Sequence, residues 1–79
     1  MHKISIKEYA EMHVECNPTM DLELFVLRLK ETLKRKNSGT KCGVCGDPIW
    51  ALGSATCGYD RCFFCITGEH DDSQDYEVY

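Results

Sequence analysis

The sequence has no long apolar segment. No apolar run approaches the roughly 20 residues that cross a membrane, and residues 1–8, MHKISIKE, contain no stretch resembling a secretory signal. Both absences favour a cytoplasmic protein with reduced thiols, because disulfides form chiefly in oxidising compartments. Internal repeats and low-complexity tracts are also absent. We therefore expect one domain over residues 1–79, with no membrane association.

The chain also offers little that indicates catalysis. No glycine loop could cradle a phosphate, and no carboxylates are paired in a pocket-forming context. His13 and Cys16 lie three residues apart on one face of a predicted helix, as a nucleophile and its base can. No acid is placed to orient the histidine. The sequence therefore predicts a protein that is not an enzyme and has no small-molecule substrate.

Basic residues are scarce in the second half. The net charge is −4; residues 1–41 contain eight of the nine Lys and Arg, while residues 66–79 contain five acids and no Lys or Arg. Overall acidity argues against a simple phosphate-binding surface and favours a protein or basic-peptide partner. Nucleic-acid binding remains an alternative that is not favoured, because cations near the end of a helix also stabilise its dipole. Its candidate residues are Lys30, Lys34, Arg35, Lys36 and Lys41.

Two helices are expected in residues 1–39. Ser5 and Glu8 form a capping box for a first helix that runs to about Cys16. Asn17 is the expected N-cap of a second helix, from about residue 18 to residue 36, and Gly39 closes it.

The second helix has more apolar surface than one contact can cover. Its main stripe, with the spacing of a buried face, comprises Leu22, Phe25, Val26, Leu29 and Leu33. A smaller set, Met20, Leu24 and Leu27, falls on roughly the opposite side. This second set is covered by the rest of the chain or binds a partner or a second copy, since exposed apolar patches usually mark interfaces.

Four of the six cysteines form two CxxC pairs, at 42–45 and 62–65, separated by sixteen residues. Two intervening residues let a tight turn aim both sulfurs at one ion. Because four cysteines close a tetrahedral shell, the site is structural rather than catalytic. Zn²⁺ is the expected metal, with Fe in a rubredoxin-like site as the alternative. The predicted ligands are Cys42, Cys45, Cys62 and Cys65.

Residues 40–66 resemble the zinc-ribbon and rubredoxin-like class, whose knuckles read CxxCG. CGVCG at 42–46 fits this pattern, whereas Ile66 replaces the glycine expected after the second pair. The resemblance implies that the four sulfurs are the ligands. A treble clef, in which the second pair opens a helix, is disfavoured by the Thr67-Gly68 that follows. The strings PIWALGSA and CFFCITGE also resemble a small uncharacterised group of bacterial and phage proteins.

Together these observations predict a small α+β fold. A two-helix unit, residues 1–39, packs on a zinc-ribbon-like β module with an acidic tail, residues 40–79. Strands are expected at 48–52 and, from its alternating pattern, at 75–79.

The leading functional interpretation is a zinc-binding adaptor or regulator that binds a protein through Met20, Leu24 and Leu27, or inhibits it. A thiol redox switch is a further alternative, because Cys57 lies five residues before Cys62 and oxidation of the thiolates would eject zinc. Cys57 itself is otherwise expected to be small and partly buried.

Overall fold

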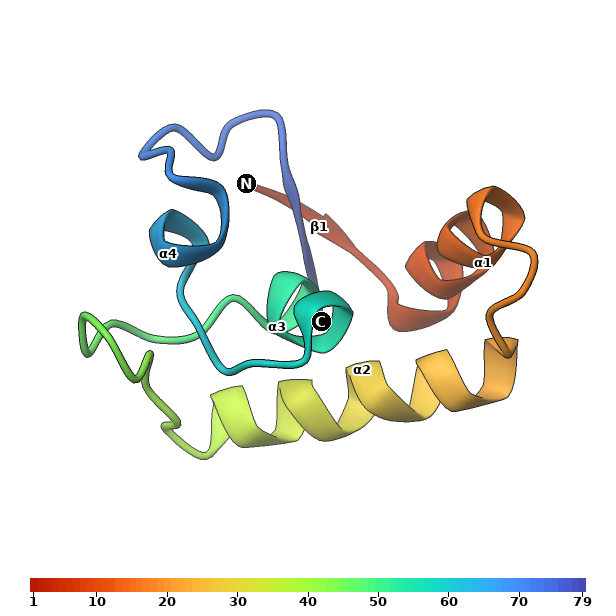
Figure 1. Cartoon of the computed structure of the whole chain (residues 1–79), viewed down its shortest axis with the longest axis horizontal. Coiled ribbons are helices and arrows are strands. Elements are labelled where there is room, and N and C mark those ends of the chain that lie inside the picture. Colours follow the sequence, from red (N-terminus) through yellow and green to blue (C-terminus); the bar gives the residue numbers. More distant parts are fainter.

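The computed structural model describes all 79 residues and contains four helices and a two-stranded parallel sheet. In Figure 1, α2 runs along one side of the molecule, α3 lies against its middle, and α1 and α4 lie toward opposite ends. The elements in chain order are β1 (His2–Ile4), α1 (Ile6–Cys16), α2 (Leu22–Asn37), α3 (Ala51–Cys57), α4 (Phe63–Thr67) and β2 (Tyr76–Val78). None of these helices has the length and apolarity that a membrane crossing requires.

Helix α1 begins and ends as its sequence predicts. The Glu8 N–H donates to Ser5 Oγ, and the Ser5 hydroxyl donates to the Glu8 carboxylate, both over 3.1 Å. The first bond satisfies an otherwise unpaired donor of the first turn and confirms Ser5 as the N-cap, whereas the Glu8 carboxylate bonds the Ser5 hydroxyl and not the Ser5 backbone N–H of a full capping box. The helix ends at Cys16, where the Asn17 side chain donates to the His13 carbonyl.

The predicted start of the second helix was wrong by four residues. α2 begins at Leu22, and its N-cap is Asp21, whose carboxylate accepts from the Leu24 N–H over 3.0 Å. Asn17, expected as the N-cap, instead closes α1. The predicted end is confirmed, because Gly39 adopts a φ of +94° and donates to the Lys36 carbonyl.

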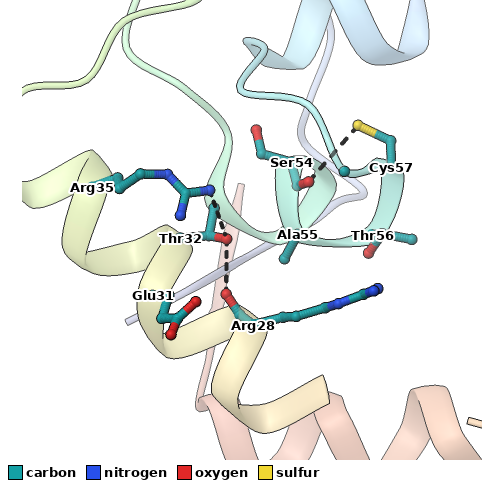
Figure 2. Close-up of a pocket in the computed structure, with 9 residues that line it drawn as sticks. Arg28, Glu31, Thr32, Arg35, Ser54, Ala55, Thr56 and Cys57 are labelled. Atoms are coloured by element: carbon teal, nitrogen blue, oxygen red, sulfur yellow. Dashed lines mark hydrogen bonds between the residues drawn. The ribbon is translucent and has the colours of Figure 1, made fainter. Parts of the chain in front are cut away.

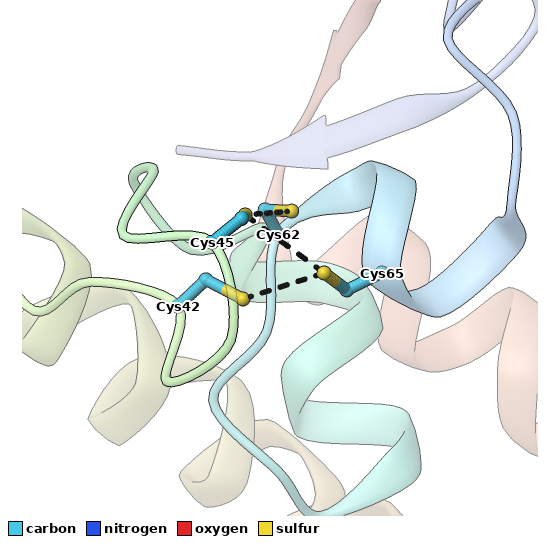
Figure 3. A group of neighbouring side chains, drawn as sticks. All are labelled: Cys42, Cys45, Cys62 and Cys65. Atoms are coloured by element: carbon cyan, nitrogen blue, oxygen red, sulfur yellow. Dashed lines mark hydrogen bonds between the residues drawn. The ribbon is translucent and has the colours of Figure 1, made fainter.

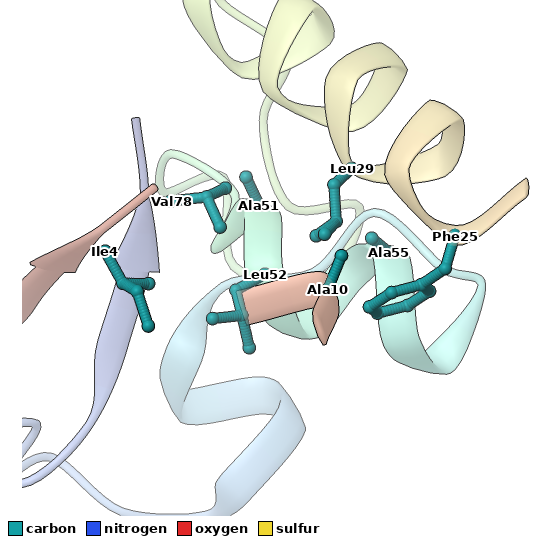
Figure 4. Packing of buried hydrophobic residues seen from close by; sticks show 8 residues of the cluster. All are labelled: Ile4, Ala10, Phe25, Leu29, Ala51, Leu52, Ala55 and Val78. Atoms are coloured by element: carbon teal, nitrogen blue, oxygen red, sulfur yellow. The ribbon is translucent and has the colours of Figure 1, made fainter. Parts of the chain in front are cut away.

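The core lies where α1, α2, α3 and both strands meet (Figure 4). Phe25 and Leu29 from the predicted stripe are fully buried, and Val26 and Leu33 pack at its margin, whereas Leu22 is 40% exposed. The buried cluster consists of Ile4, Ala10, Phe25, Leu29, Ala51, Leu52, Ala55 and Val78.

The strand expected at 75–79 is present as β2. It pairs in parallel with β1, which the sequence did not predict, in a register that places Lys3 opposite Glu77. Three residues per strand are too few to show a periodic pattern. The sheet therefore joins segments from the two ends of the sequence.

The strand predicted at 48–52 was wrong. Pro48 forms only an isolated antiparallel bridge with Lys41, and the chain turns into α3 at Ala51. Trp50 occupies the N-cap position without a side-chain cap. The cap comes instead from Glu77 on β2, whose carboxylate accepts from the Ala51 N–H at 2.8 Å and the Leu52 N–H at 2.9 Å. Residues 40–79 thus contain two helices besides β2, and the zinc-ribbon-like β module predicted for them is not confirmed.

Candidate metal centre

The first cysteine pair lies in a tight turn. The Cys42 N–H donates to the Asp47 carbonyl over 2.7 Å, and the Gly46 N–H donates to the Cys42 carbonyl over 3.0 Å. Gly46 has a φ of +78°, which a residue with a side chain rarely adopts. The Val44 N–H lies 3.4 Å from Cys42 Sγ and donates to it. This turn directs the Cys42 and Cys45 sulfurs to the same side.

The second pair opens a helix. Cys62 is the N-cap of α4, Cys65 lies in its first turn, and the Ile66 N–H donates to the Cys62 carbonyl over 3.2 Å. The sequence argument against this arrangement failed because Thr67-Gly68 ends the helix without preventing it. Gly68, with a φ of +77°, closes α4 after five residues.

Helix α3 holds the chain immediately before the second pair. The Arg61 carbonyl accepts from the Trp50 N–H at 2.9 Å and from the Ser54 hydroxyl at 3.0 Å. The Arg61 N–H donates back to Ser54 Oγ over 3.1 Å. The Trp50 ring meets Phe63 edge-on, with centroids 4.9 Å apart. These contacts fix the position of Cys62 relative to the core.

The four sulfurs surround a common point (Figure 3). All lie within 4.8 Å of one another, with separations of 3.6 Å for Cys42–Cys65, 3.8 Å for Cys45–Cys65 and 3.1 Å for Cys45–Cys62. A tetrahedral Zn–S length of about 2.3 Å implies sulfurs about 3.8 Å apart. All four thiols are free. The sulfurs therefore need only small shifts to hold one ion, and the cluster is consistent with a zinc-ribbon-like knuckle.

Hydrogen bonds divide the protons unequally among these thiols. The backbone N–H of Cys45 is the main cause that lowers the pKa of Cys42 to about 6. The hydrogen bond with the Cys62 sulfur raises the pKa of Cys45 to about 12, and the same sulfur is the main cause that raises the pKa of Cys65. A metal that binds here must displace the protons of Cys45 and Cys65, because only thiolates ligate well.

The other cysteines and histidines lie outside the cluster. Cys57 is exposed rather than partly buried as expected, and Cys16 is exposed at the end of α1. The His13 ring stacks on Phe25 with centroids 4.2 Å apart, so it packs against α2. His70 likewise stacks on the ring of Phe64, at 4.3 Å.

Of the three residues predicted to form the partner surface, one is covered by the fold and two are exposed. Met20 packs against the core, whereas the side chains of Leu24 and Leu27 are 49% and 51% exposed. The basic cluster is partly neutralised: Arg35 donates two hydrogen bonds to the Asp60 carboxylate, at 3.0 and 3.2 Å. Lys36 pairs with Glu77 over 2.7 Å. Both ion pairs reduce the charge available to a nucleic acid.

A hollow of about 410 Å³ lies between α2 and α3 (Figure 2), and none of the four clustered cysteines lines it. Several of its polar groups bond to one another. The Thr32 hydroxyl donates to the Arg28 carbonyl over 2.8 Å and accepts from Arg35 over 3.3 Å.

No protein-family model, curated protein or solved structure matches the chain.

Proposed function

We propose that the chain binds one structural Zn²⁺ through Cys42, Cys45, Cys62 and Cys65. The observation that carries this proposal is the convergence of all four sulfurs within 4.8 Å from two separate turns. Four thiolates fill a tetrahedral shell and leave no position for a reacting water. Zinc is favoured over iron because a Cys₄ site made of two CxxC pairs is the usual structural zinc arrangement.

The metal would crosslink the 42–47 turn and α4, neither of which contributes a residue to the buried cluster. The buried cluster contains no residue between Ala55 and Val78, and it contains none of the cysteines. A domain of this size buries only about 60% of its unfolded surface and often needs an added crosslink. One ion would join the 42–47 turn to α4, which otherwise share little buried apolar surface.

Native mass spectrometry of the untagged protein tests the metal. We expect a mass increment of one zinc that is lost in Cys42→Ser and Cys65→Ser. Cys16→Ser and Cys57→Ser are matched controls, because both residues are exposed and outside the cluster. A metal-free wild-type protein, or equal zinc retention in all four variants, would refute the assignment.

The zinc-stabilised chain acts as a protein-interaction adaptor or regulator. Support comes from Leu24 and Leu27, which lie one turn apart on α2, away from Phe25 and Leu29, and keep about half of their surface exposed. Leucine pairs at this spacing can anchor a partner helix or a second copy.

Sedimentation and native mass spectrometry test the adaptor role. We expect the zinc-loaded protein to retain a partner subunit or a second copy, and the Leu24→Lys/Leu27→Lys double variant to release it. Met12→Lys is the control, because Met12 on α1 has the same exposure as Leu24. A monomer that retains no subunit, or release by the control as well, would count against this role.

A redox switch is the second candidate, and one observation favours it. Cys57 and the predicted ligand Cys65 line the same hollow, of about 330 Å³, together with Tyr59, Arg61 and Ile66. A peroxide that enters could oxidise the Cys57 thiol to a sulfenic acid, with release of water. Condensation with the Cys65 thiol would then form a disulfide and a second water, with loss of zinc.

Zinc release by hydrogen peroxide distinguishes the switch from nonspecific oxidation. Cys57→Ser should release zinc several-fold more slowly than wild type, and Cys16→Ser at the wild-type rate. Equal rates in all three proteins would eliminate the switch.

A further inference from the structure

The proposed zinc site concentrates negative charge. Four thiolates around one Zn²⁺ carry a net charge of about −2. The Asp47 carboxylate adds to it, since Asp47 Oδ2 lies 3.6 Å from Cys45 Sγ, where the thiol donates to it. Residues 42–79 contain seven Asp and Glu but only one Lys or Arg, which is Arg61.

Arg61 lies against the cysteine turn. A Cβ atom built on Gly43 would stand 3.2 Å from Arg61 Nη1, so the guanidinium packs over the residue between Cys42 and Val44. The absence of a side chain at Gly43 leaves room for this approach. The Arg61 backbone is anchored to α3, as described above, and the next residue is the predicted ligand Cys62.

The positive charge of the guanidinium is not paired with a carboxylate. Its Nη1 donates to the Asp60 carbonyl over 3.0 Å, and its Cζ lies 5.8 Å from the centre of the Tyr59 ring. It forms no ion pair with a carboxylate, because Asp60, the neighbouring acid, is held by Arg35. Residues 40–79 contain two basic side chains, Lys41 and Arg61, and Arg61 is the one whose guanidinium packs over the first cysteine turn without an ion pair to a carboxylate.

We propose that Arg61 is the charge-compensating residue of the metal centre: its guanidinium lowers the free energy needed to assemble four thiolates beside Asp47. This inference rests on the proposed zinc site. Arg61 touches no reacting atom, so its effect is electrostatic and acts on metal affinity. Residues that hydrogen-bond metal ligands typically change metal affinity by about 10- to 100-fold; since Arg61 bonds none of the sulfurs, we expect an effect at the lower end of this range.

Competition with a chromogenic zinc chelator measures this effect. At about 0.01 M salt, where charges are felt over about 30 Å, Arg61→Gln should bind Zn²⁺ about tenfold more weakly than wild type. At about 1 M salt, where that distance falls to about 3 Å, most of the difference should disappear. The control is Arg28→Gln, which removes an arginine in the hollow between α2 and α3, away from the sulfurs. It should bind zinc as wild type does.

A second variant separates charge from structure. Val44 is 70% exposed in the same turn as Cys42 and Cys45. Adding Val44→Lys to Arg61→Gln supplies a new cation there and should restore most of the zinc affinity at low salt. If Arg61→Gln alone fails to fold, the double variant still tests the charge, because a new cation at position 44 should then restore folding with zinc.

Four outcomes are distinguishable. The proposal is supported if Arg61→Gln lowers the zinc affinity at low salt, if this difference from wild type becomes smaller at high salt, and if Val44→Lys restores the affinity. An affinity equal to that of Arg28→Gln overturns it, and so does a loss that is the same at both salt concentrations or that Val44→Lys does not rescue. If wild-type protein binds no zinc, the proposed function itself fails.

Discussion

Glu77 is a buried carboxylate that joins three elements. Its side chain on β2 accepts from the Ala51 and Leu52 N–H groups of α3 and from the Val78 N–H at 2.9 Å. Lys36, at the end of α2, donates to it over 2.7 Å. Glu77→Gln keeps the length of the side chain but replaces one oxygen by an NH₂ group. That group would face backbone donors or an ammonium, and neither can accept from it.

The expected loss of stability follows from these contacts. Hydrogen bonds to a charged group contribute about 1.5–3 kcal/mol each, and breaking a buried ion pair by removing one partner costs about 3–5 kcal/mol. Because the remaining oxygen of Gln can keep some donors, we expect a loss of about 3 kcal/mol. At about 0.05–0.15 kcal/mol per residue, the whole domain has only about 4–12 kcal/mol. At about 4–8 °C per kcal/mol, the Tm should fall by about 12–24 °C.

Urea unfolding of the zinc-loaded protein measures this loss. Glu69→Gln is the matched control, because it makes the same chemical change at an exposed position between α4 and β2; it should stay within about 0.5 kcal/mol of wild type. Lys36→Met should cost less than Glu77→Gln, since the carboxylate keeps its three backbone donors. A Glu77→Gln variant as stable as Glu69→Gln would refute the role of Glu77 as the cap of α3.

Three further predictions concern the metal and the packing around it. Zinc binding at about pH 7.5 should release at least two protons, because the pKa values of Cys45 and Cys65 are raised above the ordinary thiol value while that of Cys42 is about 6. Because protons compete with zinc for the thiolates, zinc affinity should rise with pH, and below about pH 6 one more proton should be released on binding. Calorimetry in two buffers of different ionisation enthalpy counts the released protons. Fewer than two released protons at about pH 7.5 would contradict this assignment. Gly53→Ala should lower the free energy of unfolding by about 1–2 kcal/mol, because the new Cβ would overlap the Trp50 ring. This loss is expected although alanine favours a helix over glycine by about 1 kcal/mol. An unchanged emission spectrum of the single tryptophan would show that the ring had not moved and would contradict the prediction. If free zinc is present at about 1,000 times its Kd, removing it with a chelator should lower the free energy of unfolding by about 4 kcal/mol and the Tm by about 16–32 °C. A Tm that does not change when the chelator is added would exclude a structural metal.

The correct sequence predictions depend on local signals. The N-cap at Ser5, the buried stripe of Phe25 and Leu29, and the closing Gly39 each involve residues within one or two turns of a helix. The four cysteines converge as expected, because each CxxC pair fixes two sulfurs locally and the sixteen residues between pairs are enough to bring the turns together. Such patterns can be recognised without knowledge of the tertiary structure.

The errors arise where the decisive partner is distant in sequence. Residues 48–52 were assigned as a strand because their apolar residues suit one, but the α3 that begins at Ala51 is capped by Glu77, 26 residues away. The alternation at 75–79 correctly indicated a strand, but it does not describe its burial, since the consecutive residues Glu77 and Val78 are both buried. The start of α2 could have been found, because Asp21 is a strong N-cap residue followed directly by Leu22 and Glu23.

The start of α3 connects the proposed metal centre to the sheet. Trp50 donates its backbone N–H to Arg61, which precedes Cys62, and its ring N–H to the Tyr76 carbonyl of β2 over 2.8 Å. The next two N–H groups of α3 bind Glu77, also on β2. Zinc and β2 would therefore stabilise the same short helix from two sides, and neither contact forms fully unless α3 is in place. By linkage, any change that frees β2 from α3 must also weaken zinc binding, although Glu77 is not a ligand. The proposed metal and the C-terminal strand would then act as one cooperative unit, because both depend on the same short helix.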